Sequence, residues 1–454
     1  MKIVIIGAVA AGLTAAYSIR KNVSGADITI LEKGSDISYG ACAFPYYIEG
    51  LIEDEDRLIA KDKDEVLGDG LDLRILSEAV DVDFTSKKVK VRNLSNSNEY
   101  DLYYDKLVIA TGAKSNRLDV FKGMKGVFPL NTLKDANAIK DYVEKHSPKN
   151  AVILGGGNKG LELLESLTLM AVDTQVIEYL PNIMNIYDQE FSDLIIKELK
   201  GEGHRINTSE EVQSAKMNEK GYIAEVVTDK AEYPVDMVIE TIGLKPNTDF
   251  LQGKGLEMDR GAIIIDLYGR TSIPDVYAGG DCTLIYNHVE KRNTYLPLGT
   301  NANKIGKLIG LAMAGKEPPF KGVQGSAMMR TFEFEMAMTG VTDRMAALLK
   351  LDFDSVMVRT RNKSGYYPGG KEHFIKLTYM KNDGKLIGAQ IFGHEGSALR
   401  IQGLVTAVFA GLTVDDLAYM DFGYIPPLNS VWDSINVAAG KATAKRNRER
   451  NSRS

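Results

Sequence analysis

The sequence AVILGGGNKG, from Ala151 to Gly160, gives the strongest indication of the fold. Its four apolar residues predict a short buried strand. Gly155, Gly157 and Gly160 then occupy the glycine positions of a G-x-G-x-x-G turn, and residues 161–170 continue as a helix. A strand, such a turn and a helix in this order are typical of a dinucleotide-binding β-α-β unit, in which the helix N-terminus faces the pyrophosphate.

The unit continues with a second strand, residues 174–177, which ends at Glu178, 18 residues after Gly160. A carboxylate at this place binds the free 2′-hydroxyl of NAD and repels the 2′-phosphate of NADP. Tyr179 adds no positive charge. We therefore predict NADH as the nucleotide and keep NADPH as the alternative.

A second copy of the pattern lies at the start of the chain. Residues 2–6 read as a buried strand, Gly7 and Gly12 hold the outer glycine positions, and Glu32 follows 20 residues after Gly12. The middle position is Val9 instead of glycine, which weakens this copy on its own. Two dinucleotide units in one chain predict a flavin and a nicotinamide held together for hydride transfer.

Composition limits the other functions that the chain can have. Its 454 residues predict about three domains. A net charge of −6, with acidic and basic residues mixed everywhere except in a basic tail, argues against nucleic acid or an anionic membrane as partner. Two cysteines make no disulfide framework, which favours a reducing cytoplasm. We expect the basic tail, residues 441–454, to be disordered.

Cys42 lies in SYGACAFPYY, residues 38–47, and is a candidate redox sulfur. A thiol beside a flavin can transfer electrons as a thiolate, and without a second cysteine nearby its partner must be an external sulfur. The simpler interpretation is a buried packing residue, and we apply that interpretation to the other cysteine, Cys282.

Three further segments complete the pattern: residues 107–113, 238–243 and 271–281. Together with the two glycine turns, and in this order, they resemble the pyridine nucleotide-disulfide oxidoreductase family of flavoproteins over residues 1 to about 440. The resemblance implies an α/β fold with two dinucleotide-binding, Rossmann-like domains plus a C-terminal α+β dimerisation domain. The cofactors that the resemblance implies are FAD and NADH, with NADPH as the alternative to NADH.

The resemblance also implies which residues bind the cofactors. Those expected at FAD are Gly7, Val9, Ala10, Gly12, Glu32, Lys33, Ser38, Val80, Ala110, Thr111, Gly112, Asp281, Leu298, Gly299 and Thr300. Those expected at the nicotinamide nucleotide are Gly155, Gly157, Lys159, Gly160, Glu162, Glu178 and Gly243. Lys159 either pairs with Glu162 on the same helix or attracts a nucleotide phosphate.

Residues 38–47 resemble the Ser-x-x-x-Cys-x-x-Pro-Tyr segment of the single-cysteine branch of this family. That branch holds coenzyme A disulfide reductases, NADH oxidases and peroxidases, and polysulfide or persulfide reductases. Ala10 stands where peroxidases and water-forming oxidases have histidine, which argues against those activities. Ala41, Asn158 and Leu428 depart from the coenzyme A disulfide reductase pattern.

The C-terminal third resembles the coenzyme A-linked members through its Tyr-Tyr-Pro-Gly and Tyr-x-Pro-Pro segments. These segments suggest Tyr424, and Tyr367 in preference to Tyr366, as proton donors to a leaving thiolate at the active site of the other subunit of a homodimer. For each tyrosine, packing with a locally satisfied hydroxyl is the alternative. Residues expected at the substrate, with coenzyme A as substrate or bound thiol, are Ser38, Arg20, Lys21, Lys61 and Asn303.

The expected domains are an FAD-binding domain of residues 1–112 and 246–322, an NAD(P)H-binding domain of residues 113–245 and a dimerisation domain of residues 323–440. The expected function is electron transfer from NADH through flavin and Cys42 to a small disulfide, coenzyme A disulfide or persulfide or polysulfide. Alternatives are an NADH oxidase that reduces O2 and a redox-sensing flavoprotein with little turnover. No metal site is expected, since the histidines show no ligand spacing.

Overall fold

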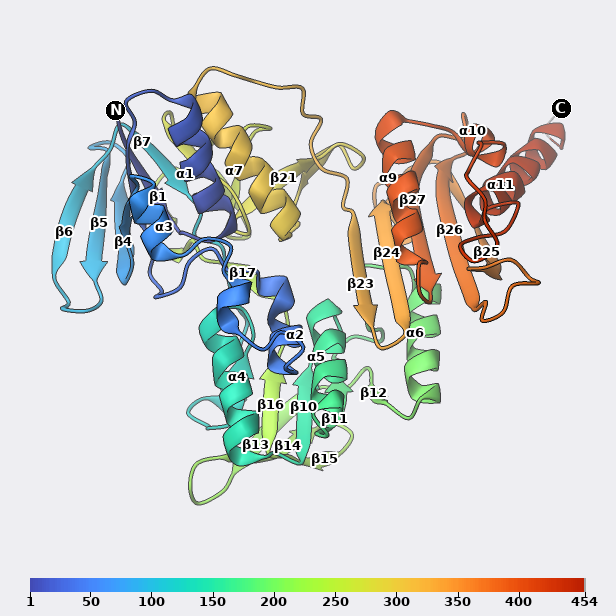
Figure 1. The fold of residues 1–454 in the computed structure, drawn as a ribbon, viewed down its shortest axis with the longest axis horizontal. Helices are drawn as coiled ribbons and strands as arrows, with labels where there is room; N and C mark the ends of the chain where they lie inside the picture. The colour runs from blue at the N-terminus through green and yellow to red at the C-terminus, as the bar shows by residue number, and fades with distance from the viewer. Residues whose placement is uncertain (453–454) are drawn as a thin grey trace. The chain divides into compact units, whose positions relative to one another are not determined.

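The computed structural model describes residues 1–452 and divides into two compact units (Figure 1). The first unit holds residues 1–122, 127–148 and 242–323. The second holds residues 123–126, 149–241 and those from 324 onward. The first glycine turn lies in the first unit and the second turn in the second unit, so each nucleotide fingerprint has a separate structural setting.

Five strands form the central sheet of the first unit, in the order β20-β7-β1-β2-β3, and all pair in parallel. They are β1 (Lys2–Ile6), β2 (Asp27–Leu31), β3 (Asp72–Arg74), β7 (Lys106–Ile109) and β20 (Val276–Ala278). The predicted strand at residues 2–6 is confirmed. The crossover from β1 to β2 runs through helix α1 (Ala10–Asn22), as a β-α-β unit requires.

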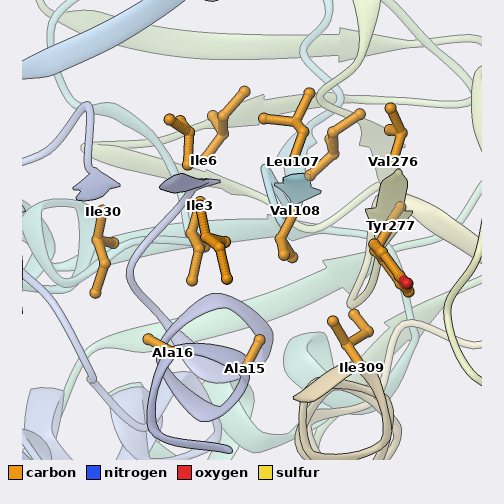
Figure 2. Packing of buried hydrophobic residues seen from close by; sticks show 14 of the residues in the cluster. Ile3, Ile6, Ala15, Ala16, Ile30, Leu107, Val108, Val276, Tyr277 and Ile309 are labelled. Atoms are coloured by element: carbon orange, nitrogen blue, oxygen red, sulfur yellow. The ribbon is translucent and has the colours of Figure 1, made fainter. Parts of the chain in front are cut away.

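Helices α1 and α7 (Gly299–Met313) lie side by side on one face of this sheet (Figures 1 and 2). Their backbones approach closely at Gly306, where an added Cβ would lie 2.5 Å from the carbonyl oxygen of Ala11. In Figure 2, Val108 and Tyr277 point toward these helices whereas Leu107 and Val276 point to the opposite face. Alternate strand residues thus bury both faces of the sheet.

Shorter elements complete the first unit. Strands β4 (Ser77–Asp83), β5 (Lys88–Asn93) and β6 (Glu99–Tyr103) form an antiparallel sheet, and β18 (Met258–Asp259), β19 (Ala262–Ile264), β21 (Thr283–Asn287) and β22 (Arg292–Thr294) form another. The other elements are β8 (Ala113–Ser115), β9 (Val127–Pro129), β17 (Leu244–Pro246), α2 (Phe44–Ile48), α3 (Lys63–Gly68) and α4 (Leu133–His146).

Helix α4 lies in the first unit, although we expected residues 113–245 to belong to the nucleotide domain of the second glycine turn. It packs against α2, the helix that follows Cys42: Lys140 Nζ donates a hydrogen bond of 2.9 Å to the carbonyl oxygen of Tyr47. Contacts of this kind are set by tertiary structure and leave no local mark in the sequence. The division into three domains stays a prediction.

The second glycine turn lies in a parallel arrangement of strands β12 (Arg205–Asn207), β11 (Asp173–Ile177), β10 (Asn150–Leu154) and β16 (Met237–Glu240), paired in that order. Helix α5 (Asn158–Leu169) follows the turn, and α6 (Gln189–Gly201) connects β11 to β12. A small antiparallel sheet joins β13 (Val212–Met217), β14 (Ile223–Thr228) and β15 (Glu232–Pro234). The second predicted β-α-β unit is therefore present.

An antiparallel sheet of five strands follows in the order β23-β24-β27-β26-β25. Its strands are β23 (Ala327–Thr331), β24 (Phe334–Gly340), β25 (Phe353–Arg361), β26 (Glu372–Met380) and β27 (Leu386–Gly393), and its helices are α8 (Asp343–Leu348), α9 (Ile401–Ala410), α10 (Val414–Ala418) and α11 (Ser434–Asn451). Helix α9 packs on β24 and β27 (Figure 1). Strands β26 and β27 pair antiparallel as a hairpin.

The expectation of a disordered basic tail is wrong for residues 441–451, which continue helix α11. Its basic side chains are used within the fold: Lys445 Nζ lies 2.6 Å from Asp354 Oδ1, and Arg446 pairs with Asp415. The charge run therefore anchors a helix on the C-terminal sheet. Residues 453–454 lie outside the described residues.

Candidate active site and nucleotide sites

The second glycine turn has no room for side chains at its first and last positions. A Cβ at Gly155, whose φ is +102°, would lie 2.7 Å from the carbonyl oxygen of Thr241, and one at Gly160 would lie 2.0 Å from that of Gly155. Gly157 is different, because it is exposed and an added Cβ would meet nothing within 4 Å. The open side of the turn is where a backbone can approach a pyrophosphate.

The first glycine turn has the same close approaches. A Cβ at Gly7 would lie 2.2 Å from the carbonyl oxygen of Ala110, and one at Gly12 would lie 1.9 Å from that of Gly7. Val9, in the place of the middle glycine, has a φ of −101° and directly precedes Ala10, the first residue of α1. Since that φ is negative, the position does not need the left-handed conformation that favours glycine.

Glu32 and Glu178 hold their turns in the same way. Glu178 accepts hydrogen bonds of 2.8 Å from the backbone N–H of Gly156 and of Leu180, and Glu32 accepts bonds of 2.8 Å from Ala8 and 2.7 Å from Gly34. Burial raises the pKa of Glu32, although these N–H groups favour its charged form. Each carboxylate keeps lone pairs for a ribose hydroxyl.

Cys42 is exposed and lies in a short turn of helix, Ala41–Ala43, directly before α2. The segment is tied to the first glycine turn, because the backbone N–H of Ser38 donates a 3.0 Å hydrogen bond to the carbonyl oxygen of Ala8. Ser38 itself has a φ of +53°, the left-handed conformation that turns the chain toward Cys42. An accessible thiol thus lies four residues after a serine that is bonded to the first glycine turn, within one structural unit.

Cys282 contrasts with Cys42 because it is fully buried, and burial raises the pKa of its thiol to about 11. Its Sγ lies 3.4 Å from the carbonyl oxygen of Gly279 and 3.5 Å from that of Ile109. This agrees with the expected packing role. Asp281, the residue before it, is half-buried, and its carbonyl oxygen accepts a 3.0 Å hydrogen bond from the hydroxyl of Tyr295.

The N-terminus of α7 is accessible: Leu298 precedes the helix, and Gly299 and Thr300 are exposed in its first turn. The N–H groups of such a turn point away from the helix and favour negative charge. The Asn303 side chain is already engaged, since it donates 2.9 Å to the carbonyl oxygen of Gly299 and accepts 2.7 Å from the hydroxyl of Thr14.

The bases expected at the substrate are only partly brought together. Arg20 Nη1 and Lys61 Nζ each lie 3.4 Å from a carboxylate oxygen of Asp69, which also accepts a 2.7 Å hydrogen bond from the hydroxyl of Tyr17. Lys21 is exposed and has no ion pair with Asp69 within residues 1–452. Asp69 is a residue that the sequence reasoning missed, because nothing local links it to Arg20.

Five other predicted residues have local settings of their own. Lys33 pairs with Glu78 at 2.7 Å, and Val80 lies at an irregularity in the pairing of β4 with β5. Gly243 has a φ of +97°, which favours glycine. On α5, burial raises the pKa of Glu162 to about 7, and the positive charge of Lys159 opposes that shift. Lys159 and Glu162 therefore interact through their charges.

The structure pairs Tyr424 with Tyr366, whereas the sequence favoured Tyr367. The hydroxyls of Tyr366 and Tyr424 form a short hydrogen bond, and the buried hydroxyl of Ser364 lies 3.3 Å from that of Tyr424. Bonds with Ser364 and Tyr366 lower the pKa of Tyr424, and the bond with Tyr424 raises that of Tyr366. Tyr367 instead lies beside Lys363, whose Nζ is 5.9 Å from the ring centre.

Two absences apply to residues 1–452. No helix there has the length and apolar character needed to cross a membrane. No cluster of three or more histidine, cysteine, aspartate or glutamate side chains in that range is arranged to hold a metal ion.

Comparisons with known proteins agree with this geometry. Residues 1–306 match the pyridine nucleotide-disulphide oxidoreductase family, and residues 327–434 match its dimerisation domain. The chain is 34% identical to an NADH oxidase of Methanocaldococcus jannaschii over 98% of this chain and 99% of the relative. It is 31% identical to an NAD(P)H coenzyme A polysulfide/persulfide reductase of Pyrococcus horikoshii over 96% and 97%.

Among solved structures, an NAD-dependent persulfide reductase from A. fulgidus superposes with a TM-score of 0.93 at 34% identity, covering 98% of this chain and 84% of that one. The family match covers more than half of the chain and contains both glycine turns and Cys42. The chain therefore belongs to the pyridine nucleotide-disulphide oxidoreductase family and is an oxidoreductase that uses FAD and a nicotinamide nucleotide.

Proposed function

We propose that this protein reduces a small disulfide, coenzyme A disulfide or a persulfide, with NADH as electron donor and Cys42 as the sulfur that exchanges with the substrate. The observation that carries the proposal is the exposed thiol of Cys42, four residues after Ser38, whose backbone N–H is bonded to Ala8 in the first glycine turn. The relatives named as polysulfide or persulfide reductases support the substrate class.

The cofactor sites follow from the two turns. Gly7 and Gly12, with Ala110 close by, would shape the turn that holds the FAD pyrophosphate, because the backbone there leaves no space for side chains. Glu32, which is bonded to the N–H of Ala8, would hold the FAD ribose. Gly157 would let the backbone approach the pyrophosphate of NADH, and Glu178 would bind its ribose. The carboxylate of Glu178 disfavours the 2′-phosphate of NADPH. Bound FAD supplies two-electron transfer between the nicotinamide and the sulfur.

The sulfur chemistry is thiol–disulfide exchange. The Cys42 thiolate attacks one sulfur of the substrate disulfide, a Cys42–S–S–R bond forms, and the first thiolate leaves. Two electrons that originate from NADH then cleave this bond, which restores the Cys42 thiolate and releases the second thiol. The sum is one disulfide, one NADH and one proton converted into two thiols and NAD⁺.

The tyrosine pair would supply the proton for the leaving thiolate. Tyr424 is 40% exposed, and its hydroxyl is oriented by Ser364 and Tyr366. In a homodimer with shared active sites these hydroxyls would serve the Cys42 of the other subunit. The dimerisation domain supports this assembly.

Arg20 and Lys61 are the proposed phosphate ligands if the thiol is coenzyme A. The proposed location of the protein is the cytoplasm.

The test uses the Cys42→Ser variant, measured under anaerobic conditions with NADH and coenzyme A disulfide. Loss of disulfide turnover with intact flavin reduction by NADH supports the proposal. Full disulfide turnover by Cys42→Ser would overturn it. Mass spectrometry of the unreduced wild-type Cys42 peptide then identifies the thiol, because coenzyme A and sulfane sulfur add different masses.

A second candidate function is NADH oxidation by O2, which the similarity to an NADH oxidase favours. It predicts rapid oxygen consumption that survives the loss of Cys42. Oxygen consumption that is slow in the wild type, compared with disulfide turnover, would exclude it.

A further inference from the structure

Asp188 is the most heavily bonded carboxylate near the second glycine turn. It lies directly before α6 and is buried. Its oxygens accept hydrogen bonds from Gln390 Nε2 at 2.6 Å and from the backbone N–H groups of Asp343 at 3.1 Å and Arg344 at 3.2 Å. Its own N–H donates 2.7 Å to Gln390 Oε1, so Gln390 binds Asp188 at two points.

Lys376 lies at the centre of the same cluster, and its side chain is 3% exposed. Its Nζ is 2.9 Å from Asp188, 2.9 Å from Glu190 and 2.8 Å from Asp343. Burial acts to lower the pKa of Lys376, but the bonds with the three carboxylates outweigh burial and raise it. The ammonium therefore stays charged, as a buried ion that is fully paired can.

Gln390 and Lys376 lie on β27 and β26 of the C-terminal sheet, whereas Asp188 ends the segment that follows Glu178. That segment packs on the glycine turn: the N–H of Met184 donates 2.8 Å to the carbonyl oxygen of Gly156. Ile183 lies so close that a Cβ on Gly156 would be 2.2 Å from its Cγ2. A continuous series of contacts thus leads from the C-terminal sheet to the second glycine turn.

One side of this segment borders a hollow. The hollow has a volume of about 220 Å³ and is lined by eight of the residues between 182 and 192 together with Asp343, Arg344 and Lys376. Within it the hydroxyl of Tyr187 is buried without a hydrogen-bond partner among the described residues. The segment is also held by a 2.8 Å hydrogen bond from the hydroxyl of Ser192 to the carbonyl oxygen of Ile183. On the side of the hollow, where packing is absent, the polar bonds to Asp188 contribute to its position.

We propose that Gln390 and Lys376 are positioning residues for NADH binding: by fixing Asp188 they hold Ile183 and Met184 against Gly156 and so keep the second glycine turn in its binding shape. This inference rests on the proposed nucleotide role of that turn. Both residues would act through Asp188, without contact to the nucleotide. Their loss weakens NADH binding and leaves turnover at saturating NADH unchanged.

The experiment compares Gln390→Leu with Gln324→Leu in the oxidised holoenzyme. Gln324 is a matched control, because it is also a buried glutamine of the C-terminal region and donates to Thr339 Oγ1 at 2.8 Å and to the carbonyl oxygen of Val405 at 2.9 Å. NAD⁺ affinity is measured by calorimetric titration, and kcat and KM for NADH by steady-state kinetics. Melting temperature and flavin content report on folding.

We expect Gln390→Leu to weaken NAD⁺ binding and to raise the KM for NADH by about fivefold, with kcat unchanged. This factor corresponds to the net contribution of about one hydrogen bond. Gln324→Leu should bind NAD⁺ like the wild type. If Gln390→Leu does not fold, Gln390→Asn, which keeps the amide but shortens its reach, should show the same direction with a smaller effect.

Equal binding by the wild type and Gln390→Leu would overturn this inference, and so would equal losses in Gln390→Leu and Gln324→Leu. Glu178→Ala in the same titration separates the two proposals. If Glu178→Ala loses affinity and Gln390→Leu does not, only the positioning role fails. If the wild type does not bind NAD⁺, the nucleotide site fails, and the positioning role fails with it.

Discussion

At the scale of single residues, Asp69 sets the charge available at the proposed coenzyme A site. It pairs with both Arg20 and Lys61, at 3.4 Å from each, and offsets part of their positive charge. A phosphate that binds these bases must compete with this carboxylate. Since all three side chains are partly exposed, the competition is worth little free energy.

We expect Asp69→Asn to lower the KM for coenzyme A disulfide by about threefold at low salt, with a smaller change at high salt because exposed charges are screened. The matched control is Asp64→Asn, which removes an exposed carboxylate from the same region. A KM that is the same in Asp69→Asn and the wild type would show that these bases do not bind the substrate.

The tyrosine pair gives a second prediction about single residues. Phenylalanine at 366 or 424 removes a hydroxyl from the pair, so we expect disulfide turnover to fall by about tenfold or more, as loss of a positioned proton donor does. Tyr367→Phe is the control and should keep most of the activity, since within residues 1–452 the hydroxyl that bonds to Tyr424 is that of Tyr366 and not that of Tyr367. A larger loss in Tyr367→Phe than in Tyr366→Phe would contradict the pairing.

The tyrosines also show where sequence reasoning reached its limit. Glycine spacing predicted both nucleotide turns because backbone geometry forces glycine at Gly7 and Gly155, and the Cys42 segment was recognisable as a continuous motif. The preference for Tyr367 over Tyr366 as proton donor stays a prediction. Adjacent residues carry the same side chain, and only tertiary structure shows that the hydroxyl of Tyr366 meets that of Tyr424.

At the scale of elements, His373 links three parts of the C-terminal region. It lies on β26 fully buried, with Nδ1 at 2.9 Å from Ser397 Oγ and Nε2 at 3.0 Å from Ser434 Oγ at the start of α11. Burial lowers the pKa of His373 to about 3, and the charge of Arg400 acts in the same direction. The native state therefore holds this ring neutral.

Because the unfolded ring has an ordinary pKa of about 6.5, the unfolded state binds the proton first as pH falls. Stability from this residue is present above about pH 6.5 and is lost between there and the folded pKa, by about 1.4 kcal/mol per pH unit. Urea unfolding at several pH values measures this slope. His373→Gln should reduce the slope, and an unchanged slope would contradict the assignment.

Across the chain as a whole, the two glycine fingerprints predicted the two nucleotide folds, and the family resemblance implied the C-terminal α+β domain. Neither predicted that α4 groups with the first unit or that the basic tail continues α11. Both follow from contacts between residues distant in sequence, such as Lys140 with Tyr47 and Lys445 with Asp354. From charge patterning alone, such a run of basic residues predicts a disordered, solvent-exposed terminus.

The most direct test of the central claim is an anaerobic NADH titration of the enzyme after incubation with coenzyme A disulfide and removal of the excess. If Cys42 holds the exchanged thiol, the wild type consumes about one equivalent of NADH per flavin more than Cys42→Ser, because its mixed disulfide takes up two further electrons. Equal consumption by the two proteins would contradict the account.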